Sequence, residues 1–107
     1  MQYTKKYLNN IIQGVFDSDK KVNEKINIEE FKQLYFSKVI KRLKQPSGKY
    51  KFNRDEYQTS IRLYLYYNNE TNIYNLLALA MIENKIFNNE KGSDKEWVKN
   101  IILLKKI

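Results

Sequence analysis

Nine lysines and arginines in the middle third of this 107-residue chain are its most chemically distinctive side chains. Residues 32–62 hold these nine against two acids, a balance of +7, whereas residues 1–31 are neutral and residues 63–107 have a balance of +1. Almost all of the net charge of +8 therefore lies in one segment. A localised basic surface is typical of proteins that bind phosphate groups, because each Lys or Arg contact releases counterions condensed on a nucleic acid. The nine residues are Lys32, Lys38, Lys41, Arg42, Lys44, Lys49, Lys51, Arg54 and Arg62.

Two missing residue types restrict the chemistry that the chain can perform. It has no cysteine, which excludes disulfides, thiolate metal sites and thiol nucleophiles. It has no histidine, which removes the commonest general base and the commonest metal ligand. No glycine-rich phosphate loop, zinc-ligand spacing or paired-carboxylate site is present either. We therefore expect a binding protein that is not an enzyme and that has no metal or cofactor.

Two tyrosines could add stacking faces to the basic segment. On a helix over residues 28–44, Tyr35 shares a stripe with Lys38, Lys41 and Arg42, so that the stripe changes from aromatic to basic along its length. The alternative is an ordinary half-buried tyrosine beside a solvated row of lysines.

Arg62 and Tyr66 are four residues apart, which places them together on the exposed side of a helix over residues 54–67. An arginine beside a tyrosine can hold a phosphate and offer a ring for stacking. Tyr66 could equally be a structural tyrosine. The candidate nucleic-acid-binding residues are Lys38, Lys41, Arg42, Lys44, Lys49, Lys51, Arg54, Arg62, Tyr35 and Tyr66.

A helix-start signal occurs three times and positions these side chains. Asn27, Asn53 and Ser93 are each followed three positions later by a glutamate and then directly by an aromatic residue. The cap side chain accepts from an early backbone N–H, so each signal predicts the first turn of a helix. With the apolar periodicity, helices are expected over residues 3–16, 28–44, 54–67, 72–87 and 94–106.

These elements predict an all-α fold, a single-domain bundle of about five helices with short loops over residues 1–107. In the first helix, the residues expected to face inward are Tyr7, Leu8, Ile11, Ile12 and Val15. Residues 17–25 are expected to form a loop. Residues 49–52 alternate enough for a short extended piece, but the sequence shows no second strand to pair with it.

The helix over residues 72–87 is apolar around nearly its whole circumference. Such a helix is either central in the core or partly covered by a partner. The first interpretation makes it the core helix. In the second, Ala78 and Met81 lie at the outer edge of a protein interface.

Two further patterns do not fit the families that they resemble. The stretch around Asp17 and Asp19 resembles an EF-hand in outline, but counting back from Glu30 places Lys21 at a calcium-ligand position. The two helices around Asn68 could suggest a helix-turn-helix, yet the second is too apolar to lie in a DNA groove.

No apolar run approaches the ~20 residues that a membrane helix needs, and the first residues lack the apolar stretch of a signal peptide. No basic amphipathic helix with a lipid-facing stripe stands out. We therefore expect a cytoplasmic protein with no membrane partner.

Residues 11–16 end in an Ile-x-x-x-Phe pattern, residues 26–43 are rich in lysine, and residues 52–67 are rich in tyrosine and leucine. Together they resemble the C-terminal helical bundle of the large subunit of type I CRISPR surveillance complexes (Cascade), systems of antiviral defence. In several of these an internal start codon yields the bundle as a separate small subunit, and this chain resembles that product.

The resemblance implies a non-catalytic subunit of a ribonucleoprotein assembly, with several copies lined along it and with other protein subunits as partners. Basic helical faces would steady the target strand or the displaced strand, through RNA or single-stranded DNA backbone contacts. By charge and placement, the residues for this role here are Lys38, Lys41, Arg42 and Arg62.

The competing hypothesis is a small phage- or plasmid-type inhibitor or immunity protein, for example an anti-CRISPR protein, that binds a protein partner. Such proteins are often short, helical and without catalytic residues. The basic segment would then meet an acidic protein surface.

Overall fold

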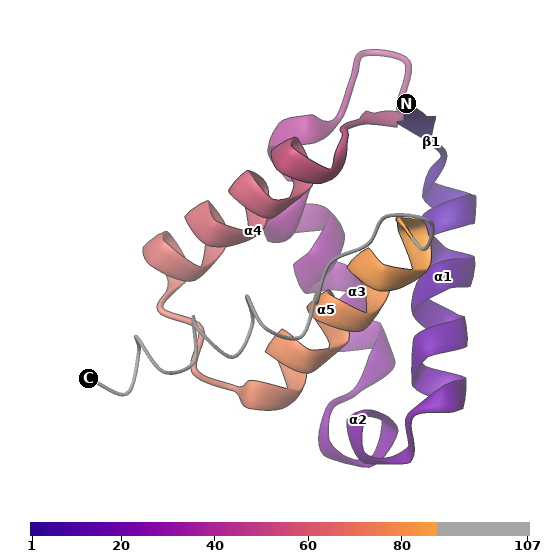
Figure 1. Cartoon of the computed structure of the whole chain (residues 1–107), viewed down its shortest axis with the longest axis vertical. Coiled ribbons are helices and arrows are strands. Elements are labelled where there is room, and N and C mark those ends of the chain that lie inside the picture. The colour runs from indigo at the N-terminus through magenta and orange to yellow at the C-terminus, as the bar shows by residue number, and fades with distance from the viewer. Residues whose placement is uncertain (88–107) are drawn as a thin grey trace.

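The structure, a computed structural model that describes residues 1–87, is an all-α bundle with one small two-stranded sheet (Figure 1). The expected helix over residues 94–106, with its Ser93 cap, lies outside the described residues. In chain order the elements are β1 (Gln2–Tyr3), α1 (Lys5–Ser18), α2 (Lys20–Lys25), α3 (Ile28–Leu34), the π-helical turn η1 (Tyr35–Val39), the 3-10 turn η2 (Lys41–Leu43), β2 (Tyr50–Lys51), α4 (Arg54–Asn68) and α5 (Ile73–Ile86).

Asparagine caps set the starts of α3 and α4, as the sequence predicts. The Asn27 Oδ1 accepts from the Glu30 backbone N–H at 3.0 Å, and the Asn53 Oδ1 accepts from the Glu56 N–H at 2.8 Å. Each cap occupies one of the backbone donors that a helix N-terminus leaves without an intrahelical partner. In α1 the cap is Thr4, whose Oγ1 accepts from the Tyr7 N–H at 3.0 Å, so this helix begins later than expected.

The prediction of a loop over residues 17–25 is wrong, because the short helix α2 lies there. The Asp19 side chain caps it by accepting from the Val22 N–H at 2.9 Å, and Val22 is fully buried. One buried apolar residue in six gives no periodicity, which is why the sequence pattern did not reveal this helix.

The helix expected over residues 28–44 begins where predicted but does not continue to its end. The Ile40 N–H donates to the Tyr35 carbonyl at 3.0 Å, a π-type bond that spans five residues, and the chain then tightens into η2. One extra residue in a turn rotates everything after it by about 100° around the helix axis. Val39 and Ile40 are therefore buried in line with Tyr35, and the expected stripe from Tyr35 to Lys38, Lys41 and Arg42 does not form.

The extended piece at residues 49–52 does have a partner, contrary to expectation. β2 pairs antiparallel with β1, with Tyr3 opposite Tyr50 and Gln2 opposite Lys51. The Tyr3 ring, expected in a helix, stacks on Phe52 with 4.6 Å between the ring centroids. This pairing joins the N-terminus to the middle of the chain (Figure 1), a long-range contact that local sequence patterns cannot predict.

A tight turn connects η2 to β2. Lys44 bridges to Tyr50, and the Gly48 N–H donates to the Gln45 carbonyl at 2.9 Å. Gly48 has a φ of 89°, a backbone conformation that glycine adopts without the steric cost of a side chain.

Helix α5 lies against α1 and α2, as the core-helix interpretation predicts (Figure 1). Its residues Ala78 and Ile82 are fully buried, whereas Met81 is half-buried. Among the residues expected to face inward on α1, Leu8, Ile12 and Val15 are fully buried and Ile11 is half-buried.

The expectation for Tyr7 is wrong, because its side chain is 41% exposed and stacks on Tyr3 with 5.6 Å between the ring centroids. No helix within residues 1–87 has both the length and the apolar character needed to cross a membrane.

A polar cluster lies inside the core. The Tyr35 and Tyr57 hydroxyl oxygens are 2.8 Å apart and hydrogen-bonded, and Glu83 of α5, also fully buried, acts electrostatically on both. Burial raises the pKa of each tyrosine well above its usual value. The cluster links η1, α4 and α5 at the centre of the bundle.

Candidate nucleic-acid interface

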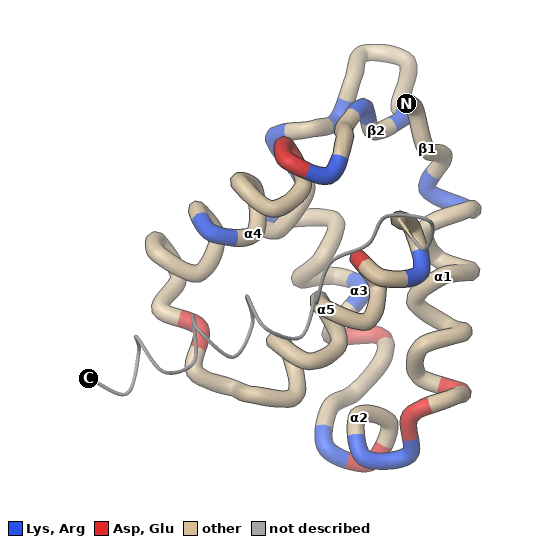
Figure 2. The backbone as a smooth tube through the Cα atoms, viewed as in Figure 1, with Lys and Arg blue, Asp and Glu red and all other residues tan. Residues whose placement is uncertain are grey.

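The cations of the basic segment are distributed over several elements (Figure 2). Lys38, Lys41 and Arg42 are exposed along η1 and η2. Lys44, Lys49 and Lys51 are exposed on and before β2, and Arg62 is exposed on α4. The charge that is contiguous in the sequence therefore lies on different parts of the fold.

A groove lies between the η1–η2 segment, which carries Lys38, Lys41 and Arg42, and α4, which forms the opposite wall. We call it the basic groove; its volume is about 550 Å³. The Ser60 hydroxyl donates to the Val39 carbonyl and ties the two walls together at the bottom. The residues that line it are Ser37, Lys38, Val39, Lys41, Arg42, Ser60, Leu63, Tyr64, Tyr67 and Asn68.

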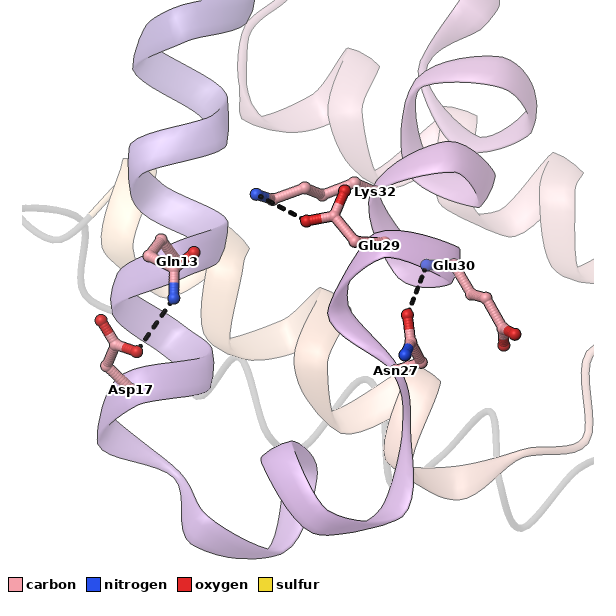
Figure 3. A network of polar contacts seen from close by, with 6 residues as sticks. All are labelled: Gln13, Asp17, Asn27, Glu29, Glu30 and Lys32. Atoms are coloured by element: carbon pink, nitrogen blue, oxygen red, sulfur yellow. Dashed lines mark hydrogen bonds and ion pairs between the residues drawn. The ribbon is translucent and has the colours of Figure 1, made fainter.

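The three cations of the basic groove are not neutralised by neighbouring acids. In the part of the chain that the structure describes, no carboxylate forms an ion pair with Lys38, Lys41 or Arg42. Lys32 behaves differently, because its Nζ lies 3.7 Å from the Glu29 Oε1 (Figure 3). Unpaired cations along one wall give the groove a positive potential that attracts anions.

The α4 wall supplies aromatic rings to the same groove. The Tyr64 hydroxyl donates to the Glu70 Oε1 at 3.1 Å, and burial together with the Glu70 charge raises the pKa of Tyr64, so this ring is held in place and neutral. Tyr67 is 76% exposed and packs edge-on against Tyr66 with 5.1 Å between the ring centroids. Tyr67 is thus the ring in this groove that is available for stacking.

Tyr35 was a candidate from the sequence, and the structure removes it from the interface. Its side chain is fully buried and its hydroxyl is bound to that of Tyr57. Tyr35 lies four residues after the buried Phe31 and shares its side of the chain, while the π turn that begins at Tyr35 rotates the lysines after it away from this side. Tyr67 lines the groove although the sequence did not predict it: its spacing from Ser60 and Tyr64 indicates a shared face of α4 but not what lies opposite that face.

Arg62 and Tyr66 are both exposed on α4, as expected, with Tyr66 exposed by 79%. They do not line the basic groove, because Arg62 lies two residues from both Ser60 and Tyr64, about 200° around the helix. The pair therefore faces a different side of α4.

The remaining candidates gather at the β1–β2 end (Figure 2). Lys44 is exposed and bridges to Tyr50, Lys49 is exposed at the tight turn, and Lys51 is exposed on β2 opposite Gln2. Arg54 is half-buried in the first turn of α4.

Residues 1–87 contain no group of three or more His, Cys, Asp or Glu side chains that could hold a metal ion. What the basic groove can do is hold phosphate groups on one wall and a planar ring on the other.

Comparison of the chain with known proteins found no matching family model and no curated protein or solved structure of significant similarity. We therefore infer the function from the charge and geometry of the groove.

Proposed function

We propose that this chain is a non-catalytic protein that binds the sugar-phosphate backbone of RNA or single-stranded DNA through the basic groove. One observation carries the proposal: Lys38, Lys41 and Arg42, which form no ion pair with an acid of residues 1–87, line one groove together with the exposed Tyr67 ring. Lysine interacts with the charge of the phosphate groups and not with the bases, so we expect binding that depends little on the nucleotide sequence.

The apolar parts of the groove support this ligand class. Val39 and Leu63 also line it, so the groove offers apolar contact to a sugar or a base whose phosphate contacts the basic wall. Arg42 can hold two phosphate oxygens at once through its planar guanidinium. A ligand that is both anionic and aromatic matches both walls.

The resemblance to Cascade small subunits extends the proposal to the assembly. We propose that the protein acts in the cytoplasm within a ribonucleoprotein, beside other subunits or copies of itself, and steadies a target or displaced strand in antiviral defence. Native mass spectrometry with a strand long enough for several copies tests this extension. More than one bound copy per strand is expected, and strict one-to-one binding on long strands would contradict it.

The main test is fluorescence anisotropy with labelled single-stranded RNA, single-stranded DNA and duplex DNA across a salt series. The slope of log affinity against log salt should be about −0.7 for each phosphate contacted on a single strand. Replacing Lys38, Lys41 and Arg42 together with alanine should weaken binding by at least about tenfold while the circular dichroism spectrum is unchanged.

A matched control variant separates the effect of the groove residues from the effect of losing three positive charges anywhere on the protein. Lys6, Lys20 and Lys21 are exposed on α1 and α2 and do not line the basic groove, so their replacement with alanine removes the same charge elsewhere. This control should bind much more tightly than the groove variant. Equal losses in the two variants, or no binding at low salt, would contradict the proposal and favour an acidic protein partner for the basic segment.

A further inference from the structure

A second groove begins where the basic groove ends. It lies on the other side of the η1–η2 segment, against α1, α3 and β2, and has a volume of about 800 Å³. Ser37 and Lys41 line both grooves, so these two residues, four apart on one face of the segment, form the ridge between them.

One part of the second groove combines lysines with aromatic rings, as the basic groove does. The Lys5 Nζ lies 5.1 Å from the centroid of the half-buried Phe36 ring, and the Phe36 and Tyr50 ring centroids are 5.7 Å apart. A backbone bridge pairs Lys44 with Tyr50, and Lys44 lines the same groove, so two exposed lysines from distant parts of the chain line a groove that also contains this aromatic pair. Lys5 comes from the N-terminal third, whose charges balance, and nothing in the sequence pattern connects it with the basic segment.

The opposite part of the second groove is acidic. Glu29, Glu30 and Lys32 line it; the Lys32 Nζ lies 3.7 Å from the Glu29 Oε1 (Figure 3), and Glu30 forms no ion pair within residues 1–87. Carboxylates repel phosphate groups, so a bound strand should turn toward Lys5 and Lys44 and away from the first turn of α3.

We infer that one nucleic-acid strand occupies both grooves, passing from Tyr67 and Arg42 over the ridge at Ser37 and Lys41 to Lys44 and Lys5. This inference rests on the proposed function and assigns Lys5, Lys44 and Phe36 to the binding site. Phe36 offers the second part of the path an aromatic surface, as Tyr67 does the first. Lys41 is the one cation that contacts the strand in both grooves.

The arrangement selects a flexible ligand. The two grooves lie on opposite sides of the η1–η2 segment, so a ligand that occupies both must bend over one turn of the chain. Duplex DNA has a persistence length of about 50 nm and resists such a bend, whereas a single strand follows it at little cost. A duplex can reach only one groove at a time.

The experiment compares wild type with single variants on two labelled oligothymidylates, of about 5 and about 15 nucleotides, lengths that span the usual range of single-strand sites. Lys5→Ala and Lys44→Ala should each weaken binding of the longer strand by about threefold to fivefold and leave the shorter strand unaffected. Lys41→Ala should weaken binding of both lengths. Lys6→Ala is the matched control, since this exposed neighbour of Lys5 lines neither groove.

The failures can be told apart. If Lys5→Ala and Lys44→Ala bind both strands as wild type does while Lys41→Ala is impaired, the site is confined to the basic groove; the inference falls and the proposed function stands. The inference also falls if Lys5→Ala weakens both lengths equally or matches Lys6→Ala. If wild type binds neither strand, the proposed function falls with it.

Discussion

Asparagine side chains decide where three of the described helices begin. Asn27, Asn53 and Asn72 each accept a hydrogen bond from a backbone N–H in the first turn that follows, at 2.8–3.0 Å. Each satisfies a donor that the helix itself leaves open, and the effect needs only residues within three positions. Cap geometry is therefore the most local determinant of this fold.

Asn27→Ala should lower the free energy of unfolding by about 1 kcal/mol, because the Glu30 N–H loses its side-chain acceptor. Urea denaturation followed by circular dichroism measures the change. Asn10→Ala is the control, as Asn10 is exposed within α1 and caps nothing, and alanine is the better helix former there. Equal destabilisation of the two proteins would mean that the cap does not hold α3.

The π turn η1 is the element that divides core from interface. Within it Tyr35, Val39 and, directly after it, Ile40 are buried in the core, whereas Ser37 and Lys41 lie on the surface between the two grooves. Such turns are poorer in hydrogen bonding than a regular helix, so they persist where packing on both sides compensates. Here burial of Ile40 and the bond from Ser60 to the Val39 carbonyl hold it.

Ile40→Ala should cost about 2–5 kcal/mol of unfolding free energy, because it leaves a cavity beneath the turn. Ile73→Ala, at the start of α5, removes the same atoms from a side chain that is 43% exposed and should cost about 1 kcal/mol or less. Thermal and urea unfolding measure both. A loss at Ile40 no larger than at Ile73 would show that the turn is not held by its core contacts.

At the scale of the whole molecule, the bundle is organised around a buried polar centre. Tyr35 from η1, Tyr57 from α4 and Glu83 from α5 meet where no side-chain surface is exposed. Buried hydroxyls persist when they are hydrogen-bonded, and a neutral tyrosine is favoured there over a charged one. The centre therefore connects three elements, and it makes the stability of the fold depend on pH in the alkaline range.

Stability should fall as the pH rises above about 10. Unfolded tyrosines ionise near that pH, while burial raises the folded pKa of Tyr35 and Tyr57, so the folded state retains protons that the unfolded state releases. The contribution is complete below pH ~10 and is lost toward the raised folded pKa, at about 1.4 kcal/mol per pH unit for each tyrosine.

Urea denaturation at a series of alkaline pH values tests this dependence, with Tyr35→Phe as the comparison. The variant should be less stable at neutral pH, because it lacks one hydrogen bond, and its stability should fall less steeply at high pH. Parallel curves for the two proteins would show that Tyr35 does not contribute.

The sequence alone determined the class of the fold and much of its local structure. Caps predicted the starts of α3 and α4, and apolar periodicity predicted the all-α class and the buried sides of α1 and α5. Composition located the charge along the chain. Each of these signals lies within a few residues of the feature that it predicts. It also placed Lys38, Lys41, Arg42, Arg62 and Tyr66 on the surface, because charged side chains and the polar side of a helix are rarely buried.

Only the tertiary structure decided which of these residues share a groove. Some of these contacts join segments that are distant in the chain: the β1–β2 pairing, the groove shared by Tyr67 and Arg42, and the contact of Lys5 with Phe36. The π turn depends on packing from two sides. One extra residue in the turn that begins at Tyr35 rotated the lysines that follow it out of line with Tyr35. Helical periodicity assumes a constant turn, so it could not predict that rotation.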